Sequence, residues 1–288
     1  MWLLLSFLTA VCTSGQDILS KRVSGQVSPY VTAWAVSFFS LPFLAVFFLW
    51  EKPVVLSAQF WPALLASTVI LTVSSIFFFK SIENSDLSLT IPLLSFTPLL
   101  LLLTSPIMLG EFPRPWGIVG MVLIVSGSYV LFYHPEQEDI LAPFRRLLKA
   151  RGSRYMVIVA ILYSIGANVD KIGMRNSSPL IWSIYLNAAV SFFLGVIMLN
   201  KVPDAQKQVQ KSWPWLLGIG CCMALVMMFQ MYALKLTIVP YVIAIKRTSI
   251  IMTSLWGVWF LKEKGDRQRV WAVALMVVGV FVISFSNS

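Results

Sequence analysis

Long apolar runs separated by short polar segments dominate the pattern of this chain. A helix needs about 20 mostly apolar residues to cross the hydrocarbon core of a bilayer, so runs of that length between charged residues, Pro or Gly mark transmembrane helices. The expected spans are 2–19, 30–50, 59–79, 87–109, 115–133, 155–173, 179–200, 213–233, 237–261 and 270–286. This pattern predicts an all-α integral membrane protein with ten transmembrane helices.

Composition supports this interpretation. The 288 residues are 58% hydrophobic and 12% charged, and the mean hydropathy is +0.81, values outside the range of soluble globular domains. The first span begins at Trp2 without a basic segment before it and contains Asp17, which favours a retained helix over a cleaved signal peptide. The longest connection, 134–154, leaves no room for a soluble domain.

The chain offers few residues for metal, redox or cofactor chemistry. Cys12, Cys221 and Cys222 all fall inside expected spans, and His134 is the single histidine. We therefore expect no disulfide framework, no metal site and no cofactor. Most of the net charge of +10 falls in the connecting loops, where it reflects topology and lipid contact, so nucleic acid is not an expected partner.

An internal repeat relates the two parts of the chain. The segment LTSPIMLGEFPRPWGIVGMVLIVSGSYVLF matches MTSLWGVWFLKEKGDRQRVWAVALMVVGVFVISF when Glu111 is placed on Glu263, an offset of 152 residues (263 − 111). The same offset superposes Leu123 on Leu275, Val125 on Val277, Gly127 on Gly279 and Val130 on Val282. The pentapeptide AVSFF at 35–39 recurs at 189–193, with an offset of 154 (189 − 35). Roughly collinear matches at nearly the same offset favour a duplication over chance identities between apolar segments.

The duplication predicts three parts: a five-helix repeat at 1–133, a basic connecting loop at 134–154 and a second five-helix repeat at 155–288. Because five is odd, the second copy must enter the membrane with the opposite orientation. Inverted repeats of this kind recur in secondary transporters, whose substrate site lies near the bilayer midplane between the repeats.

The repeats resemble the EamA family of the drug/metabolite transporter superfamily. The most specific elements are Leu109-Gly110-Glu111, then Gly120 and Gly127, and in the second half Tyr232-Ala233-Leu234-Lys235. The second copy departs from the pattern, with Leu261-Lys262-Glu263 in place of a glycine-containing motif and with Lys246-Arg247. The resemblance implies a ten-helix carrier for small molecules, and it implies no particular substrate.

Charge and resemblance disagree about orientation. The odd-numbered connections hold most of the lysines and arginines, so the positive-inside rule places both termini outside the cytoplasm. The family resemblance implies that both termini are cytoplasmic. The basic connection at 134–154 bears on this conflict, because it could lie along the membrane as an interfacial helix or form a solvated linker. The expected location is the cell membrane, as a multi-pass protein, and the inner membrane if the source is bacterial.

Two adjacent cations lie inside the ninth span. Lys246 is roughly 14 Å from the start of that span at ~1.5 Å rise per residue, too deep for full snorkelling. A cation at mid-membrane costs at least ~2.5 kcal/mol without compensation. We therefore expect Lys246, and secondly Arg247, to face a cavity and neutralise an anionic group of the substrate. Alternatively both are structural, bonded to helix-end carbonyls or to an acid, with the span shifted or broken by Pro240; Arg247 fits that role better because its fork satisfies several acceptors.

Four further residues are weaker site candidates. Asp17 and Asp170 are the most nearly buried acids, near the ends of the first and sixth spans, and either could carry a coupling proton or ion; alternatively both are helix-terminal carboxylates in water. Gln230 and Tyr241 flank the connection between the eighth and ninth spans and could contact substrate.

The favoured function is a secondary transporter that moves an organic anion or zwitterion, such as an amino acid or a phosphorylated compound, by alternating access, with export as the expected direction. The alternative is a flippase for an anionic lipid or a lipid-linked sugar. A membrane enzyme is disfavoured, because no His, Cys or carboxylate cluster can be assembled. The expected partners are a small-molecule substrate, the lipid bilayer and a coupling proton or ion, and the chain could act as a monomer or a homodimer.

Overall fold

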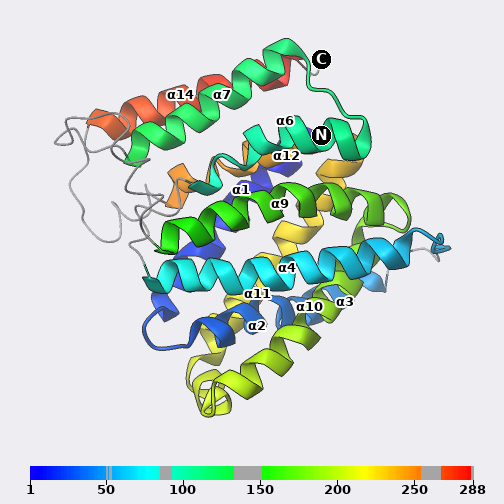
Figure 1. Ribbon diagram of the computed structural model, residues 1–288, viewed down its shortest axis with the longest axis vertical. Helices are drawn as coiled ribbons and strands as arrows, with labels where there is room; N and C mark the ends of the chain where they lie inside the picture. Colours follow the sequence, from blue (N-terminus) through cyan, green and yellow to red (C-terminus); the bar gives the residue numbers. More distant parts are fainter. Residues whose placement is uncertain (50, 52–53, 85–92, 133–150, 254–266, 287–288) are drawn as a thin grey trace. The chain divides into compact units, whose positions relative to one another are not determined.

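The computed structural model describes residues 1–288 except 50, 52–53, 85–92, 133–150, 254–266 and 287–288 (Figure 1). Within the described residues the secondary structure is helical, apart from one isolated bridge between Ser24 and Val27. The predicted all-α class is therefore confirmed for this part of the chain. Glu263 and His134, together with most of the predicted basic connection, lie outside the described residues.

The helices follow the predicted spans closely. In chain order they are α1 (Trp2–Val23), α2 (Pro29–Phe38), α3 (Ser40–Phe48), α4 (Phe60–Asn84), α6 (Thr97–Leu109), α7 (Pro115–Phe132), α9 (Arg151–Arg175), α10 (Pro179–Lys201), α11 (Ala205–Leu236), α12 (Val239–Lys246) and α14 (Arg267–Ser286). Six helical segments among the described residues are long and apolar enough to cross a membrane. Every predicted span overlaps at least one helix, and the number of ten crossings stays a prediction.

Proline marks several helix starts. Pro29, Pro115 and Pro179 each occupy the first position of a helix, where a missing N–H costs no hydrogen bond and the fixed φ suits the helix. At α10 the cap is completed by Ser178, whose hydroxyl accepts the Ile181 N–H at 3.2 Å. Local sequence therefore favours these boundaries, and a tertiary contact adds to one of them, because the Ser28 N–H before α2 donates to Gln208 Oε1 at 2.7 Å.

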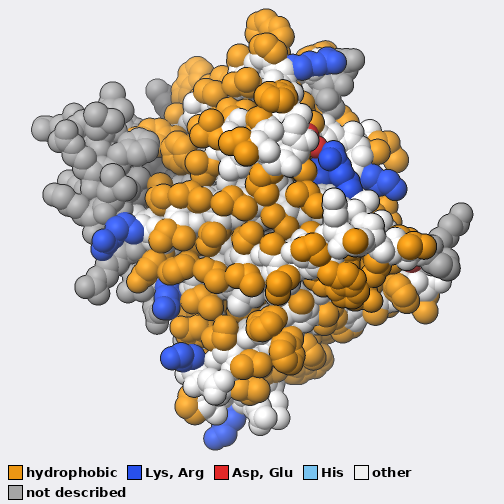
Figure 2. Space-filling view, turned by 45° about the vertical axis from the view of Figure 1, so that its right-hand side comes forward, with side chains coloured by type: hydrophobic (Ala, Val, Ile, Leu, Met, Phe, Trp, Pro, Cys, Tyr) orange, Lys and Arg blue, Asp and Glu red, His pale blue; other side chains and the backbone are white. Residues whose placement is uncertain are grey.

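The surface is strongly apolar. Hydrophobic side chains cover most of the described surface in Figure 2, while lysine and arginine side chains gather in small groups. Large exposed side chains lie along several helices, including Leu65, Phe192 and Phe281, each at least 60% exposed. Such a surface is unfavourable in water and is typical of helices that face lipid.

The chain forms two compact units that do not coincide with its sequence halves. Unit 1 comprises Met1–Ile76 and Gly166–Thr237, and unit 2 comprises Phe77–Ile165 and Ile238–Ser288. The division falls within α4, within α9 and after Thr237. Each unit therefore combines residues from the first and the second predicted repeat.

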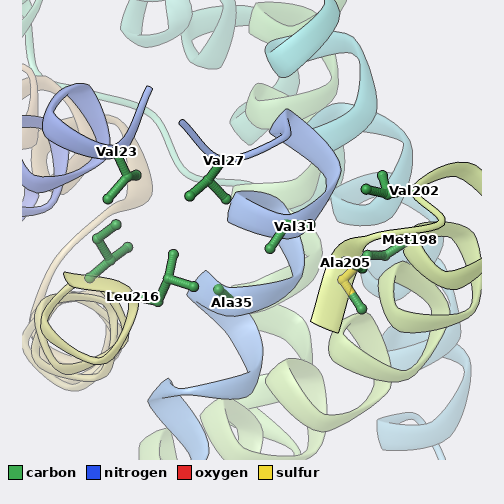
Figure 3. Close-up of a cluster of buried hydrophobic side chains, with 9 residues drawn as sticks. Val23, Val27, Val31, Ala35, Met198, Val202, Ala205 and Leu216 are labelled. Atoms are coloured by element: carbon green, nitrogen blue, oxygen red, sulfur yellow. The ribbon is translucent and has the colours of Figure 1, made fainter. Parts of the chain in front are cut away.

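The core of unit 1 gathers side chains from helices far apart in sequence (Figure 3). Its buried members are Val23, Val27, Val31, Ala35, Met198, Val202, Ala205, Leu216 and Ile219. Nearby, α11 approaches the backbone where α2 ends: a Cβ added at Gly220 would lie 2.5 Å from the Phe39 carbonyl carbon. The expected span 30–50 is thus two helices, interrupted at Phe39 where Gly220 of α11 packs against it.

Two glycine contacts in unit 1 are related by the sequence repeat. A Cβ at Gly15 in α1 would lie 3.5 Å from Cys222 Sγ in α11, and a Cβ at Gly166 in α9 would lie 3.2 Å from Ile70 in α4. Gly166 follows Gly15 by 151 residues (166 − 15), and Cys222 follows Ile70 by 152 (222 − 70). Exchanging the two halves of the sequence therefore converts one contact into the other.

Unit 2 shows the same relation where α7 lies beside α14 (Figure 1). A Cβ at Gly120 would lie 2.6 Å from the Gly279 carbonyl oxygen, and a Cβ at Gly127 would lie 2.8 Å from the Ala272 carbonyl oxygen. Adding 152 to 120 gives 272, and subtracting 152 from 279 gives 127. Shifting each residue by the repeat offset therefore converts one contact into the other. The two helices run antiparallel, because higher residue numbers in α7 contact lower residue numbers in α14.

The motif Leu109-Gly110-Glu111 joins α6 to α12 in unit 2. Gly110 ends α6 at φ +66°, a left-handed conformation that favours glycine, and its N–H bonds to the Pro106 carbonyl at 3.1 Å. The turned chain places the buried Glu111 carboxylate 2.9 Å from the Val239 N–H, at the start of α12. A carboxylate there satisfies a free amide and complements the positive end of the helix dipole.

We expect Gly120→Ala and Gly279→Ala each to lower the free energy of unfolding by about 1–3 kcal/mol, because the added methyl meets a carbonyl oxygen of the partner helix. Gly15→Ala is the matched control, since its Cβ would make an ordinary contact at 3.5 Å. Thermal unfolding of the purified protein in detergent measures all three. Equal melting temperatures for Gly15→Ala and Gly120→Ala would contradict the close packing of α7 on α14.

We expect Glu111→Ala to lower the free energy of unfolding by about 1–2 kcal/mol, the typical effect of losing a helix N-terminal partner. Glu111→Gln keeps an acceptor oxygen without the charge, so it should lower the free energy of unfolding by less than Glu111→Ala does. The same unfolding assay separates the variants. A melting temperature for Glu111→Ala equal to that of the wild type would show that this contact does not stabilise α12.

Candidate functional site

The two cations lie at an interruption of the ninth span. Helix α12 ends at Lys246, the chain turns at Arg247 and Thr248, and it is helical again over 249–253, the end of that described stretch. The single expected helix 237–261 is therefore wrong in its described part. Pro240 does not cause the interruption, because it lies in the first turn of α12, where proline is tolerated.

A matching interruption precedes α6. The chain is helical at 93–94, turns at Ser95 and Phe96, and continues as α6 from Thr97. Adding 152 converts Ser95 and Phe96 into positions 247 and 248, the positions of the other turn. The interruptions thus occupy corresponding positions in the two halves of the chain.

The backbone hydrogen bonds of the two turns also correspond. In the first turn, the N–H groups of Phe96, Leu99 and Leu100 donate to the carbonyls of Leu93 (3.2 Å), Phe96 (3.0 Å) and Phe96 (3.1 Å). In the second turn, the corresponding N–H groups of Thr248, Ile251 and Met252 donate to the carbonyls of Ile245 (2.9 Å), Thr248 (3.1 Å) and Thr248 (3.4 Å). Each turn therefore contains two corresponding i to i+3 bonds and one corresponding i to i+4 bond. Such tightened turns inside a helix often mark a functional hinge or a sequence under strain.

A threonine hydroxyl replaces a missing helical bond in the first turn. Pro98 has no N–H to donate to the Leu94 carbonyl, and the Thr97 hydroxyl donates to that carbonyl at 2.6 Å instead. In the second turn the Thr248 hydroxyl donates to the Ile245 carbonyl at 2.7 Å. Side-chain hydroxyls thus help to satisfy carbonyls that helix interruption would leave exposed.

Arg247 joins the two interruptions. Its Nη2 donates to Thr97 Oγ1 at 2.9 Å, across the packed pair α6 and α12. Lys246 and Arg247 are both half-buried, and Thr97 begins the 13-residue helix α6, whose N-terminus carries a positive partial charge. A guanidinium fork, an ammonium and a helix N-terminus in one region favour the binding of an anion.

Sequence reasoning missed two polar residues of this region, Thr97 and Ser95. Ser95 is 1% exposed, and its hydroxyl has no hydrogen-bond partner among the described residues. Subtracting the repeat offset from the number of Arg247 gives Ser95, so the repeat itself contained the signal that could have identified this residue.

Tyr241 is buried beneath the ends of two other helices. Its hydroxyl accepts the Arg114 N–H at 3.0 Å and shares a hydrogen bond with Ser286 Oγ at 3.2 Å. Its ring fills the space beside Gly117, where an added Cβ would lie 2.1 Å from the hydroxyl oxygen. These contacts hold α12 to the start of α7 and the end of α14. The predicted contact of Tyr241 with substrate stays a prediction.

The remaining candidates belong to unit 1. Gln230 is buried in α11. Asp17 is exposed within α1, whereas Asp170 is buried in α9 and accepts a hydrogen bond from the Ser67 hydroxyl of α4. The alternative that Asp170 is a hydrated helix-terminal carboxylate is therefore wrong. Lys171 is also buried and donates to the Thr237 carbonyl at 2.5 Å, at the end of α11. The coupling roles stay predictions.

Within the described residues, no group of three or more His, Cys, Asp or Glu side chains is arranged to hold a metal ion. Cys12, Cys221 and Cys222 are half-buried free thiols.

Comparison with known proteins supports a membrane carrier. A curated relative is the triose phosphate/phosphate translocator of non-green plastids from Brassica oleracea var. botrytis, 22% identical over 272 residues. The alignment covers 92% of this chain, and the chain spans 66% of the length of that protein. A protein of known crystal structure shares the fold with a TM-score of 0.75 at 15% identity, over 99% of this chain and 96% of that one.

A family model matches nearly the whole sequence, at residues 1–133 and 150–285. These ranges include both helix interruptions. Together with the long apolar helices, this match makes the chain a multi-pass membrane protein. The chain belongs to the EamA-like transporter family.

Proposed function

We propose that this protein carries a small organic anion across the membrane, and that Lys246 and Arg247 bind the anionic group at the paired helix interruptions. The observation that carries the proposal is the correspondence of the two turns, which occupy corresponding positions and share three backbone hydrogen bonds, with a cationic pair on one of them. In carriers built from repeats, interrupted helices in corresponding positions of the two halves are the best sequence-level indication of the binding site.

The contacts inside each unit support a duplicated, inverted arrangement. Helices α7 and α14 occupy corresponding places in the repeat, and their contacts at Gly120 and Gly127 exchange under the 152-residue offset. Corresponding helices that run antiparallel are related by a two-fold axis perpendicular to them. In a membrane such an axis lies in the bilayer plane, which is the arrangement expected of inverted repeats.

The chemistry of the cationic pair favours a phosphorylated substrate. A phosphoryl group offers several oxygens to a guanidinium fork and to an ammonium, whereas a cationic drug would be repelled. The relative from Brassica is named a triose phosphate/phosphate translocator, which supports the same substrate class. An amino acid remains a second substrate class, because its carboxylate could use the same pair.

In an alternating-access cycle, Lys246, Arg247 and Asp170 would have different roles. When the anion is bound, its negative charge compensates the positive charges of Lys246 and Arg247. When the site holds no anion, the hydrogen bond to Thr97 partly satisfies the Arg247 guanidinium. Export is the proposed direction, and Asp170 is the better coupling candidate of the two aspartates because it is buried.

We expect phosphorylated three-carbon compounds to stabilise the wild-type protein against heat and to leave Lys246→Met unaffected. At a ligand concentration about 100 times Kd, mass action adds about 2.7 kcal/mol to the stability of the folded state. The measurement is the melting temperature of the purified protein in detergent with a panel of inorganic phosphate, phosphorylated acids, amino acids and a cationic dye.

Lys211→Met is the matched control, because it removes the same charge from an exposed position of α11. It should respond to ligands like the wild type. If Lys246→Met responded equally to the anions, or if only the cationic dye stabilised the wild type, the proposed site would be wrong. Stabilisation by anionic lipid alone would favour the flippase.

We expect Arg247→Lys to weaken anion binding about tenfold, because lysine keeps the charge but lacks the planar fork. Arg247→Met should weaken binding further and also lower the ligand-free melting temperature, since Thr97 loses its donor. Affinities measured by ligand titration of melting temperature rank the three proteins. Equal affinity of the wild type and Arg247→Met would remove Arg247 from the site.

A further inference from the structure

We propose that the Ser95 hydroxyl is a third donor to the bound anion, supplied by the first helix interruption opposite Lys246 and Arg247. This inference rests on the proposed function and adds a residue to its site. Its starting point is the burial of Ser95, which is 1% exposed and whose hydroxyl has no partner among the described residues.

Four buried hydroxyls have no partner among the described residues, those of Thr68, Thr72, Ser95 and Ser153, and Ser95 is the one of these that lies at a helix interruption. Serines in helices commonly donate to a carbonyl one turn earlier, as Ser128 does to Ile124 at 3.1 Å and Ser74 does to Ile70 at 2.6 Å. Ser95 makes no such bond within the described residues. Because an unsatisfied buried donor is costly, its retention favours a partner that binds from outside the chain.

The repeat indicates where this hydroxyl points. Ser95 corresponds to Arg247, and Thr97 corresponds to Ser249. Arg247 donates to Thr97 at the start of α6. Replacing each residue of this pair by its counterpart in the other half gives the pair Ser95 and Ser249, and Ser249 lies two residues beyond Arg247. This relation would place the hydroxyl on the side of the first turn that faces the cationic turn. An anion held by Lys246 and Arg247 would come within its reach.

The donor set favours a phosphoryl group over a carboxylate. A phosphate ester has three terminal oxygens for an ammonium, a guanidinium fork and a hydroxyl, whereas a carboxylate has two oxygens that the cationic pair already satisfies. The Ser95 hydroxyl would thus add more to the affinity for phosphate than to the affinity for a carboxylate. It is a specificity-determining residue in this interpretation.

The test compares Ser95→Ala with the wild type in the full-length purified protein, using equilibrium binding of radiolabelled inorganic phosphate and competition by pyruvate. We expect Kd for phosphate to rise at least tenfold and the inhibition constant of pyruvate to change less than threefold. The ligand-free melting temperature should stay equal or rise, because the substitution removes an unsatisfied hydroxyl. Ser95→Cys, which keeps a weak donor of similar size, should be intermediate in Kd.

Ser128→Ala is the control, because its hydroxyl is bonded within α7 and lies outside the proposed site. It should leave Kd unchanged. Unchanged phosphate affinity in Ser95→Ala, with binding lost in Lys246→Met, would overturn the role of Ser95 and leave the proposed function standing. Unchanged affinity in both variants, or no phosphate binding by the wild type, would overturn the proposed function as well. A lower ligand-free melting temperature in Ser95→Ala would show that the hydroxyl has a partner in the protein, which also overturns the inference.

Discussion

A charged side chain among apolar helices costs several kcal/mol unless polar groups of the protein surround it. The described contacts of the buried charges follow this constraint. Glu111 accepts the first N–H of α12, Lys171 donates to the carbonyl of Thr237 directly after α11, and Asp170 accepts from Ser67. Helix ends supply two of these partners, because they carry the backbone groups that a helix leaves unbonded. Arg247 follows the same rule at an interruption, where it bonds to Thr97.

Close packing through glycine complements this rule. Where α7 meets α14, backbone approaches backbone at Gly120 and Gly279, so that few side chains separate the helices. Van der Waals contact between the closely approaching backbones stabilises such a pair in lipid, where burial of apolar surface contributes little free energy. These contacts exchange under the 152-residue offset, and those in α1 and α9 exchange under offsets of 151 and 152, so each unit relates corresponding parts of the two sequence halves. That relation places the interruptions of α6 and α12 at corresponding positions.

Much of this arrangement was readable in the sequence. Apolar run lengths predicted the helices, the match of Glu111 to Glu263 gave the offset that the glycine contacts obey, and the apolar surroundings of Lys246 identified the cationic pair. The position of the second interruption was not readable, because Pro240, where the sequence suggested a break, lies in the first turn of α12, and the turn occurs at Arg247 and Thr248. The contact of Glu111 with Val239 was also hidden, since it joins residues 128 positions apart through a backbone group. Ser95 needed both the offset and the burial that only the structure shows.

The central claim is that the two interruptions hold one anion, and an experimental structure of the full-length protein with a bound phosphorylated three-carbon acid tests it most directly. We expect phosphoryl oxygens at hydrogen-bond distance, about 2.7–3.2 Å, from Lys246 Nζ, the Arg247 guanidinium and Ser95 Oγ. A phosphoryl group bound away from both turns, with Arg247 still donating to Thr97 and no ligand atom near Lys246, would contradict the claim.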